Sequence, residues 1–142
     1  MQRILSTILV AGLSLFLVGC GEKFGTVPVS ITVMQKGSPL EDATVVAVSS
    51  DDAGNSASAI TDASGVATMQ TPAKGMGVIP GEYTVTVTKW ESKTVPAPST
   101  DDPNGTATEQ INILPAQYAD HARSGFKLSV GPKGATETFN IE

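Results

Sequence analysis

The stretch PGEYTVTVTKW, residues 80–90, shows the most regular alternation of apolar and polar side chains in the sequence. In an extended chain, one face carries Tyr83, Val85 and Val87, and the other carries Thr84, Thr86, Thr88 and Trp90. A period of two predicts a β-strand that covers a core with one of its faces. Pro80 and Gly81 are typical of a turn that precedes such a strand. We therefore expect the fold to be built around this strand.

Similar short stretches occur along the rest of the chain, separated by polar residues that form turns. The expected strands cover residues 27–33, 43–49, 56–60, 65–71, 82–90, 108–114, 126–130 and 139–141. No segment requires a helix, and residues 115–125 have room for one helical turn. Roughly eight short strands with polar turns between them predict an all-β fold, a two-layer antiparallel β-sandwich.

Some stretches also predict a position within the sheets. Pro28 predicts either an edge strand or the start of the first strand, because proline cannot donate a backbone hydrogen bond. Residues 43–49 carry apolar side chains on both faces, which predicts a strand in the middle of a layer. In TDASG, residues 61–65, Asp62 and Gly65 predict a tight hairpin turn.

Residues 91–106, ESKTVPAPSTDDPNGT, are polar and contain three prolines. This composition predicts a long, exposed and partly stiff loop. Such a loop, or an exposed strand edge, is a candidate contact for a partner protein, because sheet edges pair readily with extended chains.

The first 20 residues have the organisation of an export signal. Arg3 precedes an apolar run from Ile4 to Val18, which is shorter than the roughly 20 residues of a membrane-spanning helix. Residues 17–20, LVGC, resemble the lipobox of bacterial lipoproteins, and Cys20 is the only cysteine. The resemblance implies cleavage before Cys20, a diacylglycerol on its thiol and a fatty acyl group such as palmitate on its amino group. Two alternatives are a plain secretory signal and an uncleaved, membrane-inserted helix.

The lipoprotein interpretation divides the chain into a signal peptide (1–19), a lipidated tether (20–26) and a β-sandwich domain (27–142). Two or more acyl chains hold a protein lastingly on a bilayer. The resemblance also implies that Gly21, in place of an aspartate, favours the outer membrane over the inner one. We therefore expect a membrane-anchored lipoprotein of the bacterial cell envelope.

Three stretches within the domain resemble carboxypeptidase-regulatory-like domains. They are QKGSPLEDATVVAVS (35–49), ITDASGVATM (60–69) and IPGEYTVTVTK (79–89). The resemblance implies an Ig-like, transthyretin-type sandwich of about seven to eight strands and indicates almost nothing about activity. In such a fold, we expect Gly65 to adopt a left-handed conformation and Tyr83 to bury its ring while its hydroxyl bonds to the backbone.

The numbers of charged residues and of histidines argue against several classes of function. The chain has 9 basic and 14 acidic residues and a formal net charge of −5, without a basic cluster, which argues against nucleic-acid binding. His121 is the only histidine, so a three-histidine metal site is excluded and a serine triad would have to use it. We therefore expect His121 to lie on the surface. We expect the protein to have no enzymatic activity and no cofactor. A small hydrolase is a less favoured alternative function.

Two acidic pairs, Asp51–Asp52 and Asp101–Asp102, are weak candidates for calcium ligands. Calcium requires six to eight oxygen ligands, and neither stretch has the spacing of an EF-hand loop. Both pairs lie beside glycine, asparagine or proline, which are common in turns. We expect turns there, and no metal site.

Trp90 is the candidate contact residue for a ligand or partner. Alternation places it on the threonine-rich face, where an exposed indole would be free to stack on a sugar or anchor a partner. The alternative is that the segment around Tyr118 and Phe126 covers it. The expected function is that of a non-enzymatic, lipid-anchored interaction or structural module whose partner is an envelope protein. Carbohydrate binding through Trp90, with a polysaccharide as partner, is the alternative.

The lipobox predicts the mass of the mature protein. We expect mass spectrometry of the protein from bacterial membranes to show a chain that begins at Cys20 and carries the added mass of the lipid. A released, unmodified chain that still contains Met1 would contradict the anchor.

Overall fold

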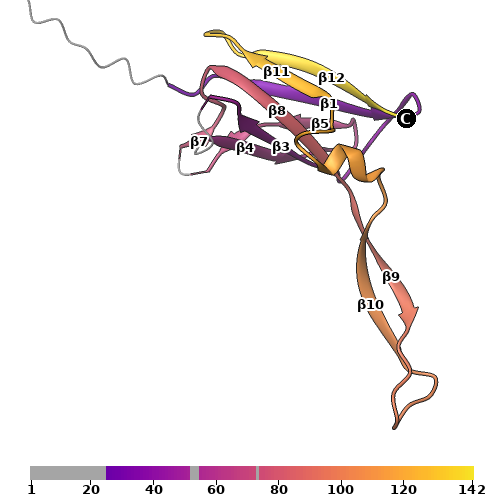
Figure 1. Cartoon of the computed structure of the whole chain (residues 1–142). Coiled ribbons are helices and arrows are strands. Elements are labelled where there is room, and N and C mark those ends of the chain that lie inside the picture. Colours follow the sequence, from indigo (N-terminus) through magenta and orange to yellow (C-terminus); the bar gives the residue numbers. More distant parts are fainter. Residues whose placement is uncertain (1–24, 52–54, 73) are drawn as a thin grey trace, which may run out of the picture.

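The computed structural model describes residues 25–51, 55–72 and 74–142 (Figure 1). The signal peptide, Cys20, Gly21 and Asp52 lie outside the described residues, so the predictions made for them stay predictions. In the described part of the chain, no helix has the length and apolarity needed to cross a membrane.

The described residues form short strands and one 3-10 turn. In chain order these are β1 (Val29–Gln35), β2 (Ser38–Pro39), β3 (Thr44–Ser49), β4 (Ser56–Ile60), β5 (Val66–Thr68), β6 (Gln70–Thr71), β7 (Gly75–Met76), β8 (Gly81–Thr88), β9 (Trp90–Pro96), β10 (Thr106–Asn112), η1 (Ala116–Ala119), β11 (Phe126–Val130) and β12 (Ala135–Ile141). One sheet has the order β12-β1-β2 with β5 also on β1, and the other has the order β11-β8-β3-β4-β6-β7. The two sheets form a β-sandwich (Figure 1), which confirms the predicted fold class.

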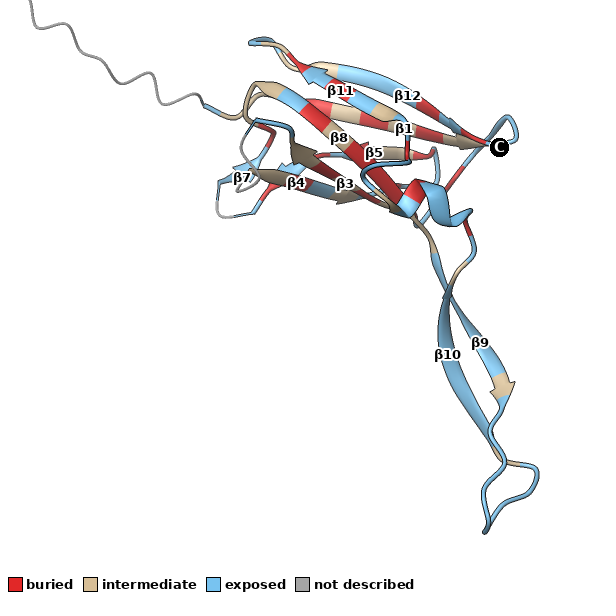
Figure 2. Ribbon diagram, viewed as in Figure 1, coloured by how far each residue is buried: buried red, intermediate tan, exposed pale blue. Residues whose placement is uncertain are grey.

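The strands β3 and β8 form the middle of the larger sheet. β3 pairs with β8 on one side and with β4 on the other, as the apolar residues on both of its faces predicted. Val45, Val85 and Val87 are completely buried in the core between the sheets (Figure 2). Tyr83 is buried beside them, and its hydroxyl donates a hydrogen bond to the carbonyl oxygen of Ile79 at 2.8 Å, as expected.

β1 is an inner strand of the smaller sheet. It pairs in parallel with β12 along its whole length and antiparallel with β2 and β5. Of the two positions predicted from Pro28, the strand start is therefore correct and the edge is wrong. Pro28 lies just before β1, where its missing N–H removes no bond of the ladder, and its carbonyl oxygen accepts the N–H of Ala135 at 3.2 Å.

The TDASG stretch is a tight turn but not a hairpin. Oδ1 of Asp62 accepts the N–H groups of Ser64 and Val66 at 2.8 and 3.1 Å, and Gly65 has a φ of 74°. β4, before the turn, pairs within the larger sheet, whereas β5, after it, pairs with β1 of the smaller sheet. The predicted hairpin is wrong because the turn carries the chain from one layer to the other.

The close packing at Gly65 predicts that Gly65→Ala destabilises the sandwich more than Gly125→Ala. Both glycines have a left-handed φ, 74° and 71°, so each alanine costs roughly 1–2 kcal/mol in backbone strain. A Cβ at Gly65 would also lie 2.6 Å from the carbonyl oxygen of Val33, whereas one at Gly125 would meet no atom within 4 Å. We expect the free energy of unfolding, measured by urea denaturation, to fall about twice as far for Gly65→Ala. Equal losses would contradict this packing.

Candidate interaction surface

Residues 90–112 form a two-stranded arm that projects from the sandwich (Figure 1). β9 continues the direction of β8 beyond Lys89, and β10 returns antiparallel to β9, with Trp90 opposite Asn112 and Pro96 opposite Thr106. The prediction of a loop over residues 91–106 is therefore wrong, since only residues 97–105 at the tip lack strand structure. Threonine, which is frequent here, is a good strand former once a partner strand is present.

The described residues leave both faces of the arm uncovered (Figure 2). Val95 and Asn112 are half-buried, and every other residue of β9 and β10 is exposed. A two-stranded ribbon without a core of its own is only marginally stable in water. The stability of the arm therefore depends on its base and on whatever it contacts.

Asn112 joins the two strands at the base of the arm. Its Oδ1 accepts the N–H groups of Lys89 at 3.1 Å and Leu114 at 3.2 Å. The N–H of Ile113 donates to the carbonyl oxygen of Lys89 at 2.9 Å. Leu114 is 4% exposed and belongs to the hydrophobic core. The returning chain is therefore fixed in the sandwich directly after it leaves the arm.

The two faces of the arm differ in chemistry. The cross-strand pairs of one face are Trp90–Asn112, Ser92–Gln110 and Thr94–Thr108, and those of the other are Glu91–Ile111, Lys93–Glu109 and Val95–Ala107. Across the first face, Nε2 of Gln110 donates to Oγ of Ser92 at 2.6 Å. The first face is uncharged, and the second carries all the charged side chains of β9 and β10.

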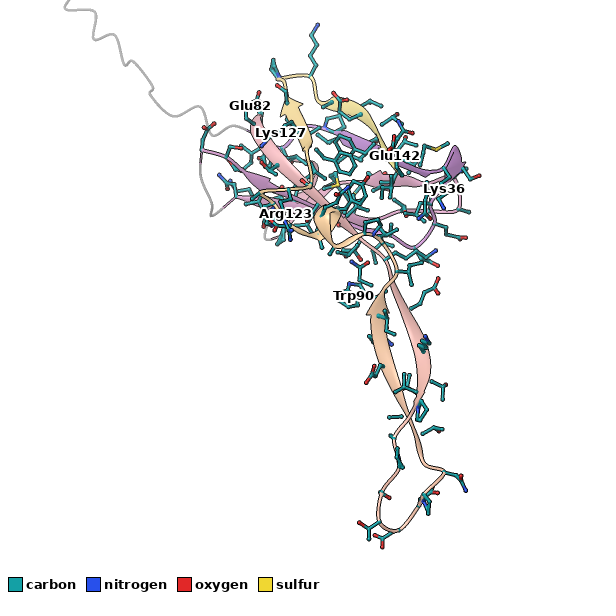
Figure 3. All side chains as sticks on the ribbon, turned by 45° about the vertical axis from the view of Figure 1, so that its right-hand side comes forward. Lys36, Glu82, Trp90, Arg123, Lys127 and Glu142 are labelled. Carbon is teal, nitrogen blue, oxygen red and sulfur yellow. The ribbon has the colours of Figure 1, made fainter. Side chains whose placement is uncertain are left out.

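Trp90 lies at the start of the arm (Figure 3), and 56% of it is exposed. The alternative in which Tyr118 and Phe126 cover it is wrong. Tyr118 and Phe126 stack on each other with ring centroids 5.3 Å apart, and Phe126 also stacks on Phe139 at 4.5 Å. The predicted threonine surface beside Trp90 also needs correction, because Thr86 is only 6% exposed. The polar neighbours of the indole come instead from the uncharged face of the arm.

Asp101 and Asp102 lie at the tip of the arm. The carbonyl oxygen of Asp102 accepts the N–H groups of Ser99 and Gly105 at 2.9 and 3.1 Å, and its Oδ1 accepts that of Asn104 at 3.0 Å. Asp102 thus makes the hydrogen bonds of a turn residue. Its carboxylate is used within the tip itself.

Asp51 is exposed in the loop between β3 and β4. This loop follows the end of β3 that is remote from the arm, because it is Thr44 that pairs with Thr88 at the arm's base. The structure therefore does not bring Asp51 together with the aspartates of the tip. Among residues 25–51, 55–72 and 74–142, no three His, Cys, Asp or Glu side chains are grouped so that they could hold a metal ion.

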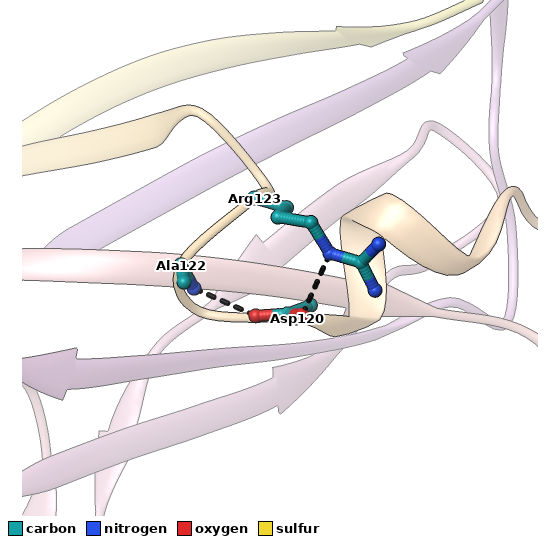
Figure 4. Close-up of polar contacts among 3 residues, drawn as sticks. All are labelled: Asp120, Ala122 and Arg123. Carbon is teal, nitrogen blue, oxygen red and sulfur yellow. Dashed lines mark hydrogen bonds and ion pairs between the residues drawn. The ribbon is translucent and has the colours of Figure 1, made fainter.

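His121 is exposed in the turn that follows η1. Asp120 shapes this turn: Oδ1 accepts the N–H of Ala122, and Oδ2 pairs with Nε of Arg123, both at 2.8 Å (Figure 4). The hydrogen bond from Ala122, and then that from Arg123, hold the pKa of the Asp120 carboxyl below its ordinary value. These contacts account for the local turn on the surface.

A shallow pocket of about 200 Å³ lies where the described chain enters the sandwich. Residues 26–29 form one side of it, and Thr68, Met69, Met76 and Gly77 form the other. Its walls are mostly apolar. None of the described candidate site residues, Asp51, Trp90, Asp101 and Asp102, lines it.

Comparison with known proteins leaves the family of this chain open. No protein-family model matches the sequence, and no curated protein matches it. Among solved structures, the chain is similar to the crystal structure of BcpA*(D312A), the major pilin subunit of Bacillus cereus, at 12% identity and a TM-score of 0.40. The similarity covers 83% of this chain and 30% of that chain, so this chain spans less than a third of the pilin's length. A likeness at this level supports no conclusion about function, and the resemblance to carboxypeptidase-regulatory-like domains stays a prediction.

Sequence reasoning identified Trp90 and predicted a strand over residues 108–114, which overlaps β10, but it missed β9 beyond Trp90 and the pairing of β9 with β10. The missed features are the strand residues of β9 after Trp90 and the bonds by which Asn112 anchors the base. The available signal was the pair of runs TKWESKTV and TATEQIN, both rich in threonine, on either side of a proline-rich tip. Because β9 has no buried face, its residues after Trp90 show no apolar alternation and look like a loop, whereas Ile111 and Ile113 indicated a strand over residues 108–114.

The bonds at the base predict that Asn112→Ala loosens the arm and leaves the sandwich intact. The change removes the acceptor of two backbone N–H groups, and each such bond contributes about 1 kcal/mol. We expect hydrogen-exchange mass spectrometry to show roughly tenfold faster exchange over residues 90–112. Gln110→Ala, which removes only the bond to Ser92, is the matched control and should change exchange less. The same exchange rates in both variants would show that Asn112 does not hold the base.

Proposed function

We propose that this protein is a lipid-anchored, non-enzymatic module of the bacterial cell envelope that contacts a partner protein through its arm. The apolar run and the LVGC stretch at residues 17–20 support export and lipid anchoring at Cys20. The β-sandwich provides a rigid body, and the stretches resembling carboxypeptidase-regulatory-like domains support a binding or structural role. Gly21 supports the outer membrane as the location.

The observation that carries this proposal is the projecting arm. Natural proteins usually shorten, charge or cover the edges of their sheets, because an exposed edge pairs with other chains. The arm carries charged residues, but it is neither short nor covered: it extends two seven-residue strands into solvent, and β9 and β10 pair only with each other among the described residues. An extended segment of a partner would add to either edge through main-chain hydrogen bonds.

The position of the arm suits this role. The described chain enters the sandwich at the end where β1 begins, and the arm leaves it at the opposite end, after β8 (Figure 1). A protein tethered through residues 20–26 would therefore hold the arm away from the point of attachment. The arm would be free to meet a partner beyond the sandwich.

Carbohydrate binding is the second candidate, and one observation favours it. The indole of Trp90 is 56% exposed and belongs to an uncharged face that also presents Ser92, Gln110 and Asn112. Aromatic rings that stack on sugars are commonly accompanied by hydroxyl and amide groups of this kind. Binding of an envelope polysaccharide that is lost in Trp90→Ala would support this candidate.

Site-specific photocrosslinking in intact cells tests the proposed function. We expect a photoreactive amino acid at Thr94 of β9 or Thr108 of β10, in the full-length chain, to give specific crosslinks to protein. The matched control is Lys133, which is exposed in the turn between β11 and β12 and should give none. Crosslinking at the arm no stronger than at Lys133 would contradict a protein-binding arm.

A further inference from the structure

The hydrogen bonds of the arm determine which backbone groups of β9 face outward. At the base, the N–H of Ile113 donates to the carbonyl oxygen of Lys89 at 2.9 Å, and near the tip the N–H of Ala97 donates to that of Gly105 at 2.8 Å. Hydrogen-bonded and non-hydrogen-bonded pairs alternate along an antiparallel ladder. The odd-numbered residues of β9 therefore bond to β10. The residues whose backbone groups point away from β10 are Trp90, Ser92, Thr94 and Pro96.

The outer edge of β9 is self-complementary in charge. Glu91 and Lys93 flank Ser92 symmetrically, and both are exposed. A second copy of the same strand, turned end to end about Ser92, would place its lysine opposite this glutamate and its glutamate opposite this lysine. Opposite charges on directly facing residues of neighbouring strands stabilise a sheet, and like charges destabilise it.

We propose that β9 pairs antiparallel with β9 of a second copy of this chain, about a two-fold axis through Ser92. The inference rests on the proposed function and names the partner of the arm. The product is a continuous four-stranded sheet of order β10-β9-β9-β10, in which each copy contributes the same edge. Such an interface is closed by its symmetry, so that it produces a dimer.

This register satisfies the outward backbone groups of both copies. Ser92 faces Ser92 of the second copy, and the two residues exchange both N–H···O=C bonds. Trp90 and Thr94 form the next hydrogen-bonded pair on each side, so the exposed indole gains a threonine neighbour. Glu91 and Lys93 fall on the non-hydrogen-bonded pairs between them, where side chains approach most closely.

Every shifted register loses either the pairs of opposite charges or some of the backbone hydrogen bonds between the two copies of β9. A two-fold axis at Glu91 or at Lys93 sets that residue against its own copy, which brings like charges together. An axis at Thr94 sets Ser92 opposite Pro96, which has no N–H to donate. An axis at Trp90 sets Ser92 opposite Thr88, which already pairs with Thr44 of β3.

The outer edge of β10 lacks this complementarity. Glu109 is the only charged residue of β10. Pairing of two β10 strands about any axis therefore creates no pair of opposite charges, and an axis at Glu109 creates a repulsive one. The charge pattern selects the β9 edge.

Disulfide crosslinking of the full-length protein in bacterial membranes tests the register. Facing Cα atoms of a hydrogen-bonded antiparallel pair are about 5.5 Å apart, within the range that a disulfide spans. We expect Ser92→Cys to give a covalent dimer under mild oxidation. Thr94→Cys alone should give none, because its two copies lie four residues apart, roughly 13 Å along the strand. Coexpressed Trp90→Cys and Thr94→Cys chains should crosslink to each other.

Two controls accompany this experiment. Thr108→Cys lies on the outer edge of β10 and should give no covalent dimer. The unaltered chain, whose only cysteine is Cys20, shows the background. A dimer with Thr108→Cys and none with Ser92→Cys would overturn the choice of edge.

Charge reversal tests the complementarity independently. Glu91→Lys or Lys93→Glu alone should lower the dimer association constant roughly tenfold, because each converts two attractive pairs into repulsive ones. The double variant Glu91→Lys/Lys93→Glu should restore it. Sedimentation of the purified full-length protein in detergent measures this constant. A double variant that stays as weak as the single ones would overturn the proposed register.

The outcomes separate this inference from the proposed function. Photocrosslinks from the arm to a different protein, with no Ser92→Cys dimer, would overturn the second copy as partner and leave the interaction role of the arm. Absence of both would overturn both proposals.

Discussion

The burial of the apolar face of β8 is the constraint on which the rest of the structure depends. Tyr83, Val85 and Val87 project into the core, and this fixes the orientation of β8 between β3 and β11. After Lys89 the chain continues in the same direction and forms β9. The hydrophobic core therefore determines where the arm starts, although the arm itself contributes almost nothing to that core.

The arm presents an energetic problem that the sandwich does not. Ordering each residue costs about 1–2 kcal/mol of backbone entropy, and exposed strands have little apolar burial to offset that cost. The contacts that do offset it lie at the two ends: the bonds of Asn112 and the burial of Leu114 at the base, and the turn around Asp102 at the tip. Between them, the ribbon depends on cross-strand pairs and gains most from any further strand that joins it.

The sequence predicts the sandwich well because burial leaves a pattern. The alternating residues of β1 and β8, and the doubly apolar β3, were sufficient to place the core strands and the fold class. The sequence does not show which sheet a strand enters after a turn, because Asp62 and Gly65 specify a bend and not a partner. It also does not distinguish an exposed hairpin from a loop, because Ser92 and Thr94 have no buried face. Trp90 could be named as a contact residue, but its exposure depends on where Tyr118 and Phe126 pack, which is a tertiary property.

The parallel pairing of β1 with β12 has a consequence for how the chain acquires its structure. The first of the long strands can complete its ladder only after the last has left the ribosome, so contacts of the greatest sequence separation close the smaller sheet. Such topologies fold slowly, because the chain loses conformational entropy before the stabilising long-range contacts form. Until β12 has emerged, the edge of β1 that β12 covers in the folded protein has no partner strand.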